Sequence, residues 1–598
     1  MQAKKPKAVL LKRLSKTKSH ASTIIKQSEI SVDKMLLGRI ERLSNVKRFV
    51  SLWLGSLLLL IVIVIFQIFN LSSYYQRVAT VPGGIFIEGS SGVYTNANPI
   101  YATTDPDNTI SALIFAGLFK NGPNGQLLPD LASGYSTADN GKQYIVHLKA
   151  GLTWQDGQPL TSKDVVFTFD TIENPNAGSP LFSDWQGIQV SAPNPDTVVF
   201  TLPDVLASFP YQLTTGILPQ HLLQNIPVTD LKSANFNTIH PVGAGPFEWG
   251  AIQVINGNNP SNEEVQIALK PFPKYNSGKP KLNQFEEDIF ANQNQLTTAF
   301  LNHSITAMEA ITPPPINVQN NPGVIKYNFI LRAATMVFFR NTANDGIMND
   351  QTVRTALVEG VNVRSIIKHL GYPTFRVNEP FLQNQFTYNS KYAQPGYNPS
   401  QAIKLLVSDG WTTIKNGIRY KNNQPLEFTL TAANNQENQM VISELKNQLK
   451  KIGVDLNPQL LDPLDFISAL NEHNYDAVLT SISIGVDPDV FVYWDSAQAS
   501  IQSATRLNFS EFENSTADES LQAGRIRLNP QLRIIEYQPF LQAWQTAEPA
   551  LGLYQPRLLY LSNTPIGGLK TFQLTNNSDR FENVQNWEIQ QAKVNIEP

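Results

Sequence analysis

Residues that commonly perform catalysis are few and scattered in this chain. Its seven histidines stand at positions 20, 147, 221, 240, 303, 369 and 473, and no two have the H-E-x-x-H spacing of a zinc hydrolase. The sequence contains no G-x-S-x-G nucleophile elbow and no Walker A phosphate loop. Gly243-Ala-Gly245 lacks the third glycine of a dinucleotide loop, because Glu248 occupies that position. We therefore expect a protein that is not an enzyme and that holds no cofactor.

Cysteine is absent from all 598 residues, which excludes disulfides, thiolate metal sites and a lipid-modified N-terminal cysteine. No local group of histidines offers another metal site. Charged residues make up 16% of the chain, below the usual quarter, and asparagine and glutamine supply much of the polar surface instead. A chain of this length exceeds a single core, so we expect about two to four domains.

An apolar run from Phe49 to Phe69 is interrupted only by serine, glycine and Gln67. A helix of that length spans roughly 30 Å, about the thickness of a hydrocarbon core. The run is longer than the apolar part of a secretory signal, no clear A-x-A cleavage site follows it, and it is apolar on every face, unlike a core helix. We predict one uncleaved transmembrane helix over residues 49–69.

The charge on either side of this run predicts its orientation. Residues 1–48 contain 13 lysines and arginines against 3 acidic residues, whereas the whole chain has a net charge of −3. Positive charge is retained on the cytoplasmic side of a membrane. We therefore expect a cytoplasmic N-terminus, a single-pass helix in the cell membrane and a large extracytoplasmic portion. A nucleic-acid-binding role for the basic tail is the weaker interpretation.

One pattern between residues 144 and 169 predicts a strand, a turn and a helix. Tyr144–Leu148 alternates apolar and polar residues, as a half-buried strand does. Thr161 stands three residues before Asp164, which is the spacing of a helix capping box. The favoured role of the enclosed Trp154 and Asp156 is packing of the subdomain rather than contact with a ligand.

The run Leu148–Phe169 resembles a signature of the extracytoplasmic solute-binding proteins of peptide-type ABC importers, family 5. Its leucine, basic residue, glycine, tryptophan, Asp-Gly, Pro-Leu and Asp-Val-Val-Phe follow the order found in that family. The resemblance extends over almost all of residues 83–598. Further segments that resemble the family, in the family's order, are Leu113–Phe119, Leu128–Ala132, Pro241–Phe247, Val353–Leu357, Pro399–Leu406, Leu445–Val454, Tyr475–Leu479 and Asp487–Asp489.

The resemblance implies a mixed α/β protein with a large, bilobal periplasmic-binding-protein-like fold, preceded by one transmembrane helix. The lobes would join through two crossing segments near Phe329–Arg332 and Ala550–Tyr554, and the helical pattern of Thr352–Leu370 belongs to the second lobe. The implied division is 1–48 basic cytoplasmic tail, 49–69 transmembrane helix, 70–82 linker, 83–123 first part of lobe I, 124–235 inserted subdomain, 236–330 second part of lobe I, 331–550 lobe II and 551–598 C-terminal part of lobe I.

The function that this resemblance implies is capture of a solute outside the membrane and its delivery to the permease subunits of an ABC importer. The leading prediction for the cargo is an oligopeptide, and a non-peptide solute such as an oligosaccharide is the alternative. A surface sensory or adhesion receptor that reuses the fold is the rival function, and an extracellular hydrolase is the weakest. The expected partners are the solute, the permease and, through residues 49–69, the lipid bilayer, but no nucleic acid.

Dipeptide-binding members of the family hold the ligand's amino group with an aspartate and its carboxylate with an arginine. The corresponding positions here are Ile484, three residues before Asp487-Pro-Asp489, and Ala432. The loss of both charges argues against a strict receptor for free dipeptides, because charge-assisted pairs are what fixes ligand length. The alternatives are longer peptides held by their backbone, an uncharged solute, or charged anchors at other positions.

Position in the family pattern also nominates ligand-binding residues. The candidates are Tyr94, Asn96 and Asn98 after the first strand, Arg340 and Arg376 as relocated carboxylate partners, and Trp411, Asn434, Asn435, Asp487, Tyr493 and Trp494 in the second lobe. The competing interpretations are structural: ion pairing for the two arginines, helix capping for Asp487 and buried packing for the tryptophans.

Overall fold

The structure, a computed structural model, describes residues 46–123, 125–259, 263–310, 314–342, 346–503 and 505–595. Most of the basic tail expected over residues 1–48 therefore lies outside the described residues. The chain forms two compact units, Met1–Ala79 together with Gln591–Pro598, and Thr80–Gln590.

The first unit contains the apolar run. Helix α3 (Lys47–Tyr75) has 29 residues, and its segment Phe49–Ile68 is long and apolar enough to cross a membrane. Strand β1 (Gln76–Val81) follows at once and pairs with β23 (Gln590–Asn595). The linker expected over residues 70–82 is thus replaced by the last turns of α3 and by β1, because the alternating β-branched residues of β1 favour a strand.

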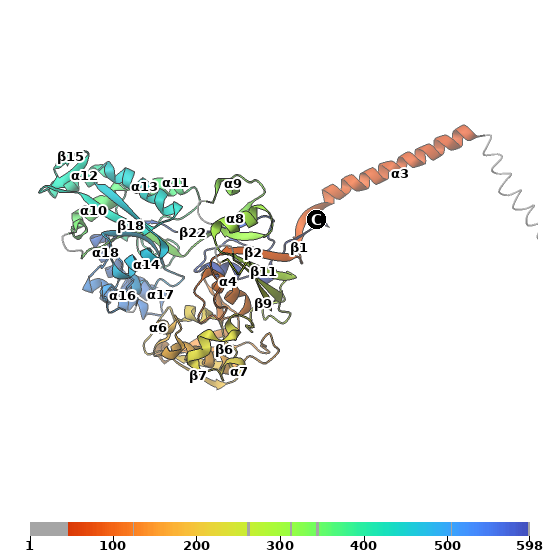
Figure 1. Cartoon of the computed structure of the whole chain (residues 1–598), viewed down its shortest axis with the longest axis horizontal. Helices are drawn as coiled ribbons and strands as arrows, with labels where there is room; N and C mark the ends of the chain where they lie inside the picture. The colour runs from red at the N-terminus through yellow and green to blue at the C-terminus, as the bar shows by residue number, and fades with distance from the viewer. Residues whose placement is uncertain are drawn as a thin grey trace, which may run out of the picture. The chain divides into compact units, whose positions relative to one another are not determined.

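Three larger sheets organise the second unit (Figure 1). The seven-stranded sheet has the order β13 (Ile325–Ile330), β22 (Arg557–Ser562), β12 (Ala307–Ala310), β2 (Ile85–Ser91), β11 (Gln284–Phe290), β10 (Glu264–Pro271) and β9 (Phe247–Ile255). The four-stranded sheet has the order β5 (Ala132–Ala138), β6 (Gln143–Leu148), β8 (Thr197–Thr201) and β7 (Gln189–Asn194). The five-stranded sheet has the order β19 (Asp455–Leu461), β18 (Glu427–Ala433), β20 (Ala477–Ser483), β14 (Ala333–Phe339) and β21 (Ala550–Tyr554).

Helices cover both faces of the five-stranded sheet. Every residue of β14 is buried, and alternate side chains enter different cores, with Val337 in one and Phe338 in the other. The first core is completed by α10 (Gln351–Gly360), α11 (Val363–Leu370), α12 (Pro399–Ser408) and α13 (Gln436–Lys450), which lie beside β18 in Figure 1. The second core is completed by α14 (Pro463–Glu472), α15 (Phe491–Trp494), α16 (Ser515–Arg525) and α18 (Gln538–Ala547), with α17 (Pro530–Glu536) against α16.

The remaining helices pack on the other two sheets. Helices α4 (Asp105–Ile114), α8 (Gln293–Leu301) and α9 (Ile316–Gln319) lie with the seven-stranded sheet, and α5 (Ser162–Glu173), α6 (Phe182–Trp185) and α7 (Gln220–Leu223) with the four-stranded sheet. Small ladders join β3 (Phe119–Asn121) to β4 (Leu127–Pro129), and β15 (Thr413–Lys415), β16 (Ile418–Lys421) and β17 (Gln424–Pro425) to one another.

The strand, turn and helix predicted between residues 144 and 169 are confirmed as β6 and α5. The Thr161 backbone N–H donates to the Asp164 carboxylate at 2.8 Å, which is one half of the expected capping box. Trp154 is fully buried in the core, and the Asp156 carboxylate lies 2.7 Å from the His221 ring nitrogen. Both residues therefore have the structural roles favoured for them.

The helical pattern of Thr352–Leu370 forms two helices rather than one. The break falls at Val361 and Asn362, where the Asn362 side chain accepts a hydrogen bond from the Ser365 backbone N–H at 3.2 Å and begins α11. An asparagine at this position competes with the helix backbone for hydrogen bonds, which explains why it caps a new helix instead of continuing the first.

The chain crosses between the seven-stranded and five-stranded sheets twice. Leu331-Arg332 joins β13 to β14, and Gln555-Pro556 joins β21 to β22, while the Leu331 N–H donates to the Pro556 carbonyl at 2.8 Å. Strand β21 pairs with β14, so Ala550–Tyr554 stays in the five-stranded sheet. The sequence predicted that the chain returns to lobe I after residue 550. In the structure the chain leaves the five-stranded sheet at Gln555, because β21 stays paired with β14 up to Tyr554.

Buried carboxylates lie in the centre of the seven-stranded sheet. Glu88 and Glu287 are partners on the parallel strands β2 and β11, and both are fully buried. Glu88 forms an ion pair with Arg580 and accepts a hydrogen bond from the Tyr560 hydroxyl at 2.5 Å. Burial, and then the neighbouring Glu88, raises the pKa of Glu287 well above its usual value. Burial therefore favours the protonated form of Glu287 in the folded state.

The raised pKa of Glu287 predicts a pH-dependent stability. The raised pKa of Glu287 contributes to the free energy of unfolding. This contribution is fully present below the usual glutamate pKa and is lost as pH rises through the raised pKa, because over this range the unfolded state releases the proton more readily than the folded state. Glu287→Gln cannot ionise, so it should reduce the loss of unfolding free energy between pH 5 and pH 8 by about 1 kcal/mol or more. Thermal unfolding at both pH values measures this, with the exposed Glu427→Gln as control. Parallel pH profiles for wild type and Glu287→Gln would contradict the assignment.

Candidate functional site

The carboxyl ends of four strands, β18, β19, β20 and β21, lie at one edge of the five-stranded sheet. Strands β18 and β20 are parallel, and β14 runs antiparallel to β20 and to β21. The chain leaves β18 toward β19 on one side and leaves β20 toward β21 on the other, so β18 and β20 form a topological switch point. Crevices that bind ligands in α/β sheets form at such points.

A pocket of about 600 Å³ opens at this switch point, and we call it the switch-point pocket. Its volume lies within the usual range for small-ligand sites. Arg557 comes from the seven-stranded sheet, just beyond a crossing, and the other lining residues come from the five-stranded sheet and its helices. The lining residues are Thr335, Ala433, Asn435, Gln436, Glu437, Asn438, Phe466, Leu479, Thr480, Ser481, Tyr554 and Arg557.

Two oppositely charged side chains line the switch-point pocket. Glu437, in the first turn of α13, accepts hydrogen bonds from the hydroxyls of Tyr554 at 2.8 Å and Tyr372 at 3.1 Å. The Arg557 guanidinium lies 3.8 Å from the centroid of the Tyr372 ring and donates to the side chain of Asn328. Tyr372 therefore contacts both charged groups.

Burial disfavours the charged form of each group. It raises the pKa of Glu437, although the two tyrosine hydroxyls and Arg557 partly oppose the rise. Burial also lowers the pKa of Arg557, against the opposing influence of Tyr372 and Glu437. The pocket thus holds an acidic and a basic side chain that are both partly removed from water.

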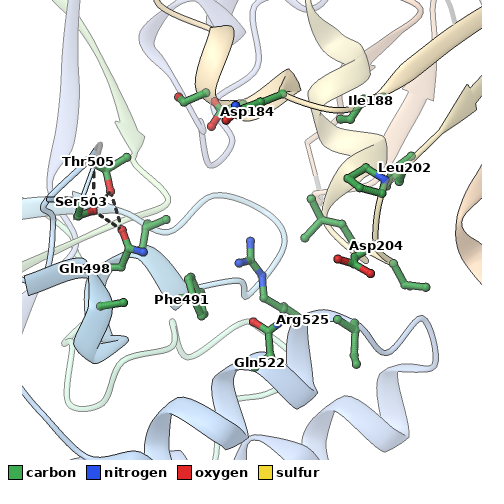
Figure 2. Close-up of a pocket in the computed structure, with 18 of the residues that line it drawn as sticks. Asp184, Ile188, Leu202, Asp204, Phe491, Gln498, Ser503, Thr505, Gln522 and Arg525 are labelled. Carbon is green, nitrogen blue, oxygen red and sulfur yellow. Dashed lines mark hydrogen bonds between the residues drawn. The ribbon is translucent and has the colours of Figure 1, made fainter. Parts of the chain in front are cut away.

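A larger pocket of about 760 Å³ lies between residues 183–212, beside the four-stranded sheet, and residues 491–526. Figure 2 shows Asp184, Ile188, Leu202 and Asp204 on one side, and Phe491, Gln498, Gln522 and Arg525 on the other. The Ala207 N–H donates to the Arg525 carbonyl at 2.9 Å, and the Ser208 hydroxyl donates to Asp489 at 3.3 Å. These bonds join the two sides next to the pocket.

The charged groups of the larger pocket are mostly paired within the protein. Arg525 lies 3.2 Å from the Asp489 carboxylate and 4.3 Å from the centroid of the Phe491 ring. Asp204 lies 3.3 Å from the Lys142 amine and is well exposed. The switch-point pocket is therefore the stronger candidate for recognition of a charged solute, even though it is the smaller of the two.

Among the residues nominated from the sequence, Asn435 lines the switch-point pocket. Its side chain also caps α13 by accepting from the Asn438 N–H at 2.8 Å. The neighbouring Asn434 is exposed, and its side chain accepts from Gln439 at 2.9 Å. The expected anchor positions Ala432 and Ile484 are both buried in hydrophobic cores, so neither presents a polar group to a ligand.

Tyr94, Asn96 and Asn98 form a local structural network instead of lining either pocket. The Asn98 side chain donates to the Asn237 side chain at 3.0 Å, and the Tyr94 hydroxyl donates to the Asn237 carbonyl at 3.2 Å. Asn96 is buried, and its side-chain oxygen accepts from the Asn98 N–H at 2.7 Å. These three side chains hold the loop before α4 in place.

The two nominated arginines lie at opposite edges of the five-stranded sheet. Arg340 follows the end of β14, away from the switch point, and its Nε lies 3.2 Å from the Glu511 carboxylate. Arg376 forms an isolated bridge with Tyr554 at the switch-point edge but does not line the pocket. Burial, and then Arg364, lowers the pKa of Arg376.

The remaining candidates, in or near the cores of the five-stranded sheet, also make contacts within the protein. Asp487 binds Arg533 through two hydrogen bonds of 2.6 and 2.7 Å, so it caps no helix and is already paired. The Tyr493 hydroxyl donates to the Ser483 carbonyl at 2.8 Å. Trp411 and Trp494 are buried in the two cores of the five-stranded sheet.

Four residues of the site carry no obvious signal in the sequence: Tyr372, Glu437, Tyr554 and Arg557. Glu437 is an acidic residue in the first turn of a helix, a position where acidic residues are common and predict no ligand contact. Tyr372 and Tyr554 are far apart in the chain, and their convergence depends on the Arg376–Tyr554 bridge beside them. The sequence offers one hint: Glu437 is an acidic residue in the first turn of the long helix α13, which follows strand β18.

Comparison with known proteins identifies the family. Residues 126–531 match the profile described as bacterial extracellular solute-binding proteins, family 5 middle. The chain belongs to this family. Among similar proteins, the oligopeptide-binding protein AppA of Bacillus subtilis is 25% identical over 505 residues, covering 79% of this chain and 86% of its own.

Solved structures agree on the fold of this family 5 protein. AppA of Bacillus subtilis in complex with a nonapeptide superposes with a TM-score of 0.68 at 23% identity, covering 86% of this chain and all of AppA. NikZ of Campylobacter jejuni in complex with Ni(L-His) also gives 0.68, at 24% identity, over 85% of this chain and all of NikZ. The mixed α/β, bilobal periplasmic-binding-protein-like fold expected from the sequence is confirmed.

The Asp487–Arg533 pair predicts a stability effect that is separate from binding. Removing one partner of a buried, bidentate ion pair leaves an uncompensated charge and costs about 3–5 kcal/mol. Asp487→Ala should therefore lower the unfolding free energy of the full chain by that amount, measured by denaturant titration with tryptophan fluorescence. The cap variant Asn435→Ala should cost only about 1 kcal/mol. A smaller loss for Asp487→Ala than for Asn435→Ala would contradict the structural role of the pair.

Proposed function

We propose that this chain is the solute-capturing component of an ABC importer and that its cargo is a peptide. The observation that supports this most directly is the switch-point pocket, which takes Arg557 from the seven-stranded sheet and its other residues from the five-stranded side. A solute held there touches both halves of the molecule. A relative named for oligopeptide binding supports the choice of peptide.

In this proposal, lobe I consists of the seven-stranded sheet with the four-stranded sheet as its inserted subdomain, and lobe II consists of the five-stranded sheet. The crossings Leu331-Arg332 and Gln555-Pro556 serve as the hinge. Cargo stabilises the closed form only to the extent that it binds that form more tightly than the open one. The permease subunits would receive the closed form, and no catalytic step is involved.

Binding of peptides to the full chain in detergent tests this function. A peptide mixture at about 100 times its dissociation constant should raise the unfolding free energy by about 2.7 kcal/mol, because ligand binds only the folded state. Thermal unfolding measures the shift, and native mass spectrometry identifies the bound species. A shift produced by an oligosaccharide mixture, with none from peptides, would contradict peptide cargo.

The larger pocket favours the alternative cargo, an oligosaccharide. Its lining includes the neutral amide side chains of Gln186, Gln212, Gln498, Gln502 and Gln522 and an aromatic ring from Phe491. The Ser503 and Thr505 hydroxyls donate to Gln498 at 2.9 and 2.8 Å, which leaves the Gln498 amide N–H groups as donors. Amides, hydroxyls and one ring suit a hydroxyl-rich solute without charge.

We also propose that α3 anchors the protein in the cell membrane with its N-terminus inside. The apolar segment Phe49–Ile68 and the basic residues before it support this topology. Protease added to intact cells or right-side-out vesicles should then digest the large portion while an epitope at the N-terminus survives. Carbonate washing should leave the full chain in the membrane fraction. Release of the chain by carbonate, or loss of the N-terminal epitope, would contradict an N-inside anchor.

A further inference from the structure

One wall of the larger pocket depends on a buried histidine that lies outside the pocket. Residues 496–503 and 505–511 form this wall segment, and its members Gln498, Ser503 and Thr505 line the pocket (Figure 2). His473 follows the end of α14, is fully buried and contacts the wall segment through both ring nitrogens. We propose that His473, with a proton on both ring nitrogens, is a positioning residue that holds the wall segment in the conformation that forms the larger pocket. This inference goes beyond the proposed function and does not depend on the identity of the cargo.

Each ring nitrogen of His473 faces an oxygen that accepts hydrogen bonds. Nδ1 lies 3.0 Å from a carboxylate oxygen of Glu511, and Nε2 lies 3.1 Å from the backbone carbonyl oxygen of Arg506. A neutral imidazole carries one N–H and can donate only one of these bonds, whereas the doubly protonated ring donates both. Both contacts are therefore hydrogen bonds at the same time only when the ring carries two protons.

The Glu511 carboxylate supplies the negative charge that balances the ring. Its second oxygen lies 3.2 Å from the Arg340 Nε and also accepts a hydrogen bond from the Thr342 hydroxyl. Burial opposes ionisation of Glu511, but the hydrogen bonds from His473 and Arg340 outweigh burial and lower the pKa of the carboxyl group. Because an ionised carboxylate cannot donate, we assign the proton between Glu511 and Nδ1 to the ring.

Few other groups compete for this role. The charged and titratable side chains in contact with His473 or with its partner Glu511 are those of Arg340, Arg506 and Tyr475. The Arg506 guanidinium donates to backbone carbonyls instead of to Glu511. Burial, and then Glu511, raises the pKa of the Tyr475 hydroxyl, so Tyr475 adds no charge near neutral pH. Glu511 is therefore the anion that is paired with His473.

A chain of hydrogen bonds extends from the His473–Arg506 contact to the pocket. The Arg506 backbone N–H donates to the Ser503 hydroxyl at 3.1 Å, and this hydroxyl donates to the Gln498 side chain at 2.9 Å. The Thr505 hydroxyl donates to the same Gln498 oxygen at 2.8 Å, as Figure 2 shows. Loss of the Arg506 anchor therefore releases the residues that orient the Gln498 amide in the pocket.

Backbone strain makes the wall segment dependent on this anchor. His473, Arg506 and Glu511 have φ angles of 53, 46 and 50°, in the left-handed region that residues with a side chain seldom adopt. Such conformations persist only where the surrounding contacts hold them. The doubly protonated ring joins all three strained residues, so the loss of one N–H donor lets part of the wall segment relax.

The test uses the absence of cysteine, which allows a single spin label to be placed at a chosen position in the full chain in detergent. Ile501→Cys puts the label on the wall segment, where the side chain is 83% exposed, and Lys404→Cys puts a reference label on an exposed position of α12. Electron paramagnetic resonance measures label mobility between about pH 5 and pH 9, a range that covers the usual titration of histidine. Raising the pH should increase the mobile fraction at position 501 by about tenfold, because a hydrogen bond from a charged group is lost, and should leave position 404 unchanged.

Three variants give this effect a direction. His473→Gln presents a donor at only one end of its side chain, so the wall segment should be mobile at every pH. Glu511→Gln removes the anion that favours the protonated ring and should move the rise in mobility to lower pH. Arg340→Gln removes a nearby cation and should move the rise to higher pH. A residue that only fills space would produce no such opposite shifts.

The exposed His240→Gln is the matched control and should keep the wild-type pH profile. Thermal unfolding confirms that each variant is folded before label mobility is compared. If His473→Gln fails to fold, the opposite shifts of Glu511→Gln and Arg340→Gln decide the question. A label at position 501 whose mobility does not change with pH, or a pH dependence that survives in His473→Gln, would overturn the inference.

Discussion

The architecture depends on two chain crossings that lie side by side. Strands β13 and β22 pair in the seven-stranded sheet, β14 and β21 pair in the five-stranded sheet, and each pair is continuous through a two-residue crossing. The hydrogen bond from Leu331 to Pro556 ties the crossings to each other. Because β14 is buried on both faces, the crossings are anchored firmly in the five-stranded sheet. The carboxyl ends of β18 and β20 are thereby brought to the junction of the two halves.

Each half of the molecule places a glutamate, tyrosine and arginine together in a buried setting, with different results. In the seven-stranded sheet, Arg580 pairs directly with Glu88 and Tyr560 completes the cluster, so the charges are compensated within the protein. At the switch point, the tyrosines stand beside Glu437 and Arg557 while the group opens into a pocket. The same residue types therefore form a closed cluster in one place and line a pocket in the other.

The features that sequence predicted well are local in the chain. The capping box of Thr161 and Asp164, the apolar helix and the order of strands and helices depend on residues within a few positions of one another. The structure places most of the nominated ligand residues in contacts within the protein, because a polar residue after a strand has many partners available once the chain folds. Asp487 illustrates this: its partner Arg533 is 46 residues away and reaches it only through the packing of α17.

By itself, the sequence determined the family, the alternation of sheets and helices, and a helix apolar enough to cross a membrane, since periodicity and composition are sufficient for these. It also determined that Ala432 and Ile484 are uncharged. Only the tertiary structure decided which charges meet: Glu437 and Arg557 are 120 positions apart and share a pocket because strand pairing at the crossings brings them to one edge. A local pattern cannot contain that information, because the partners of a charged side chain are chosen by packing between distant segments.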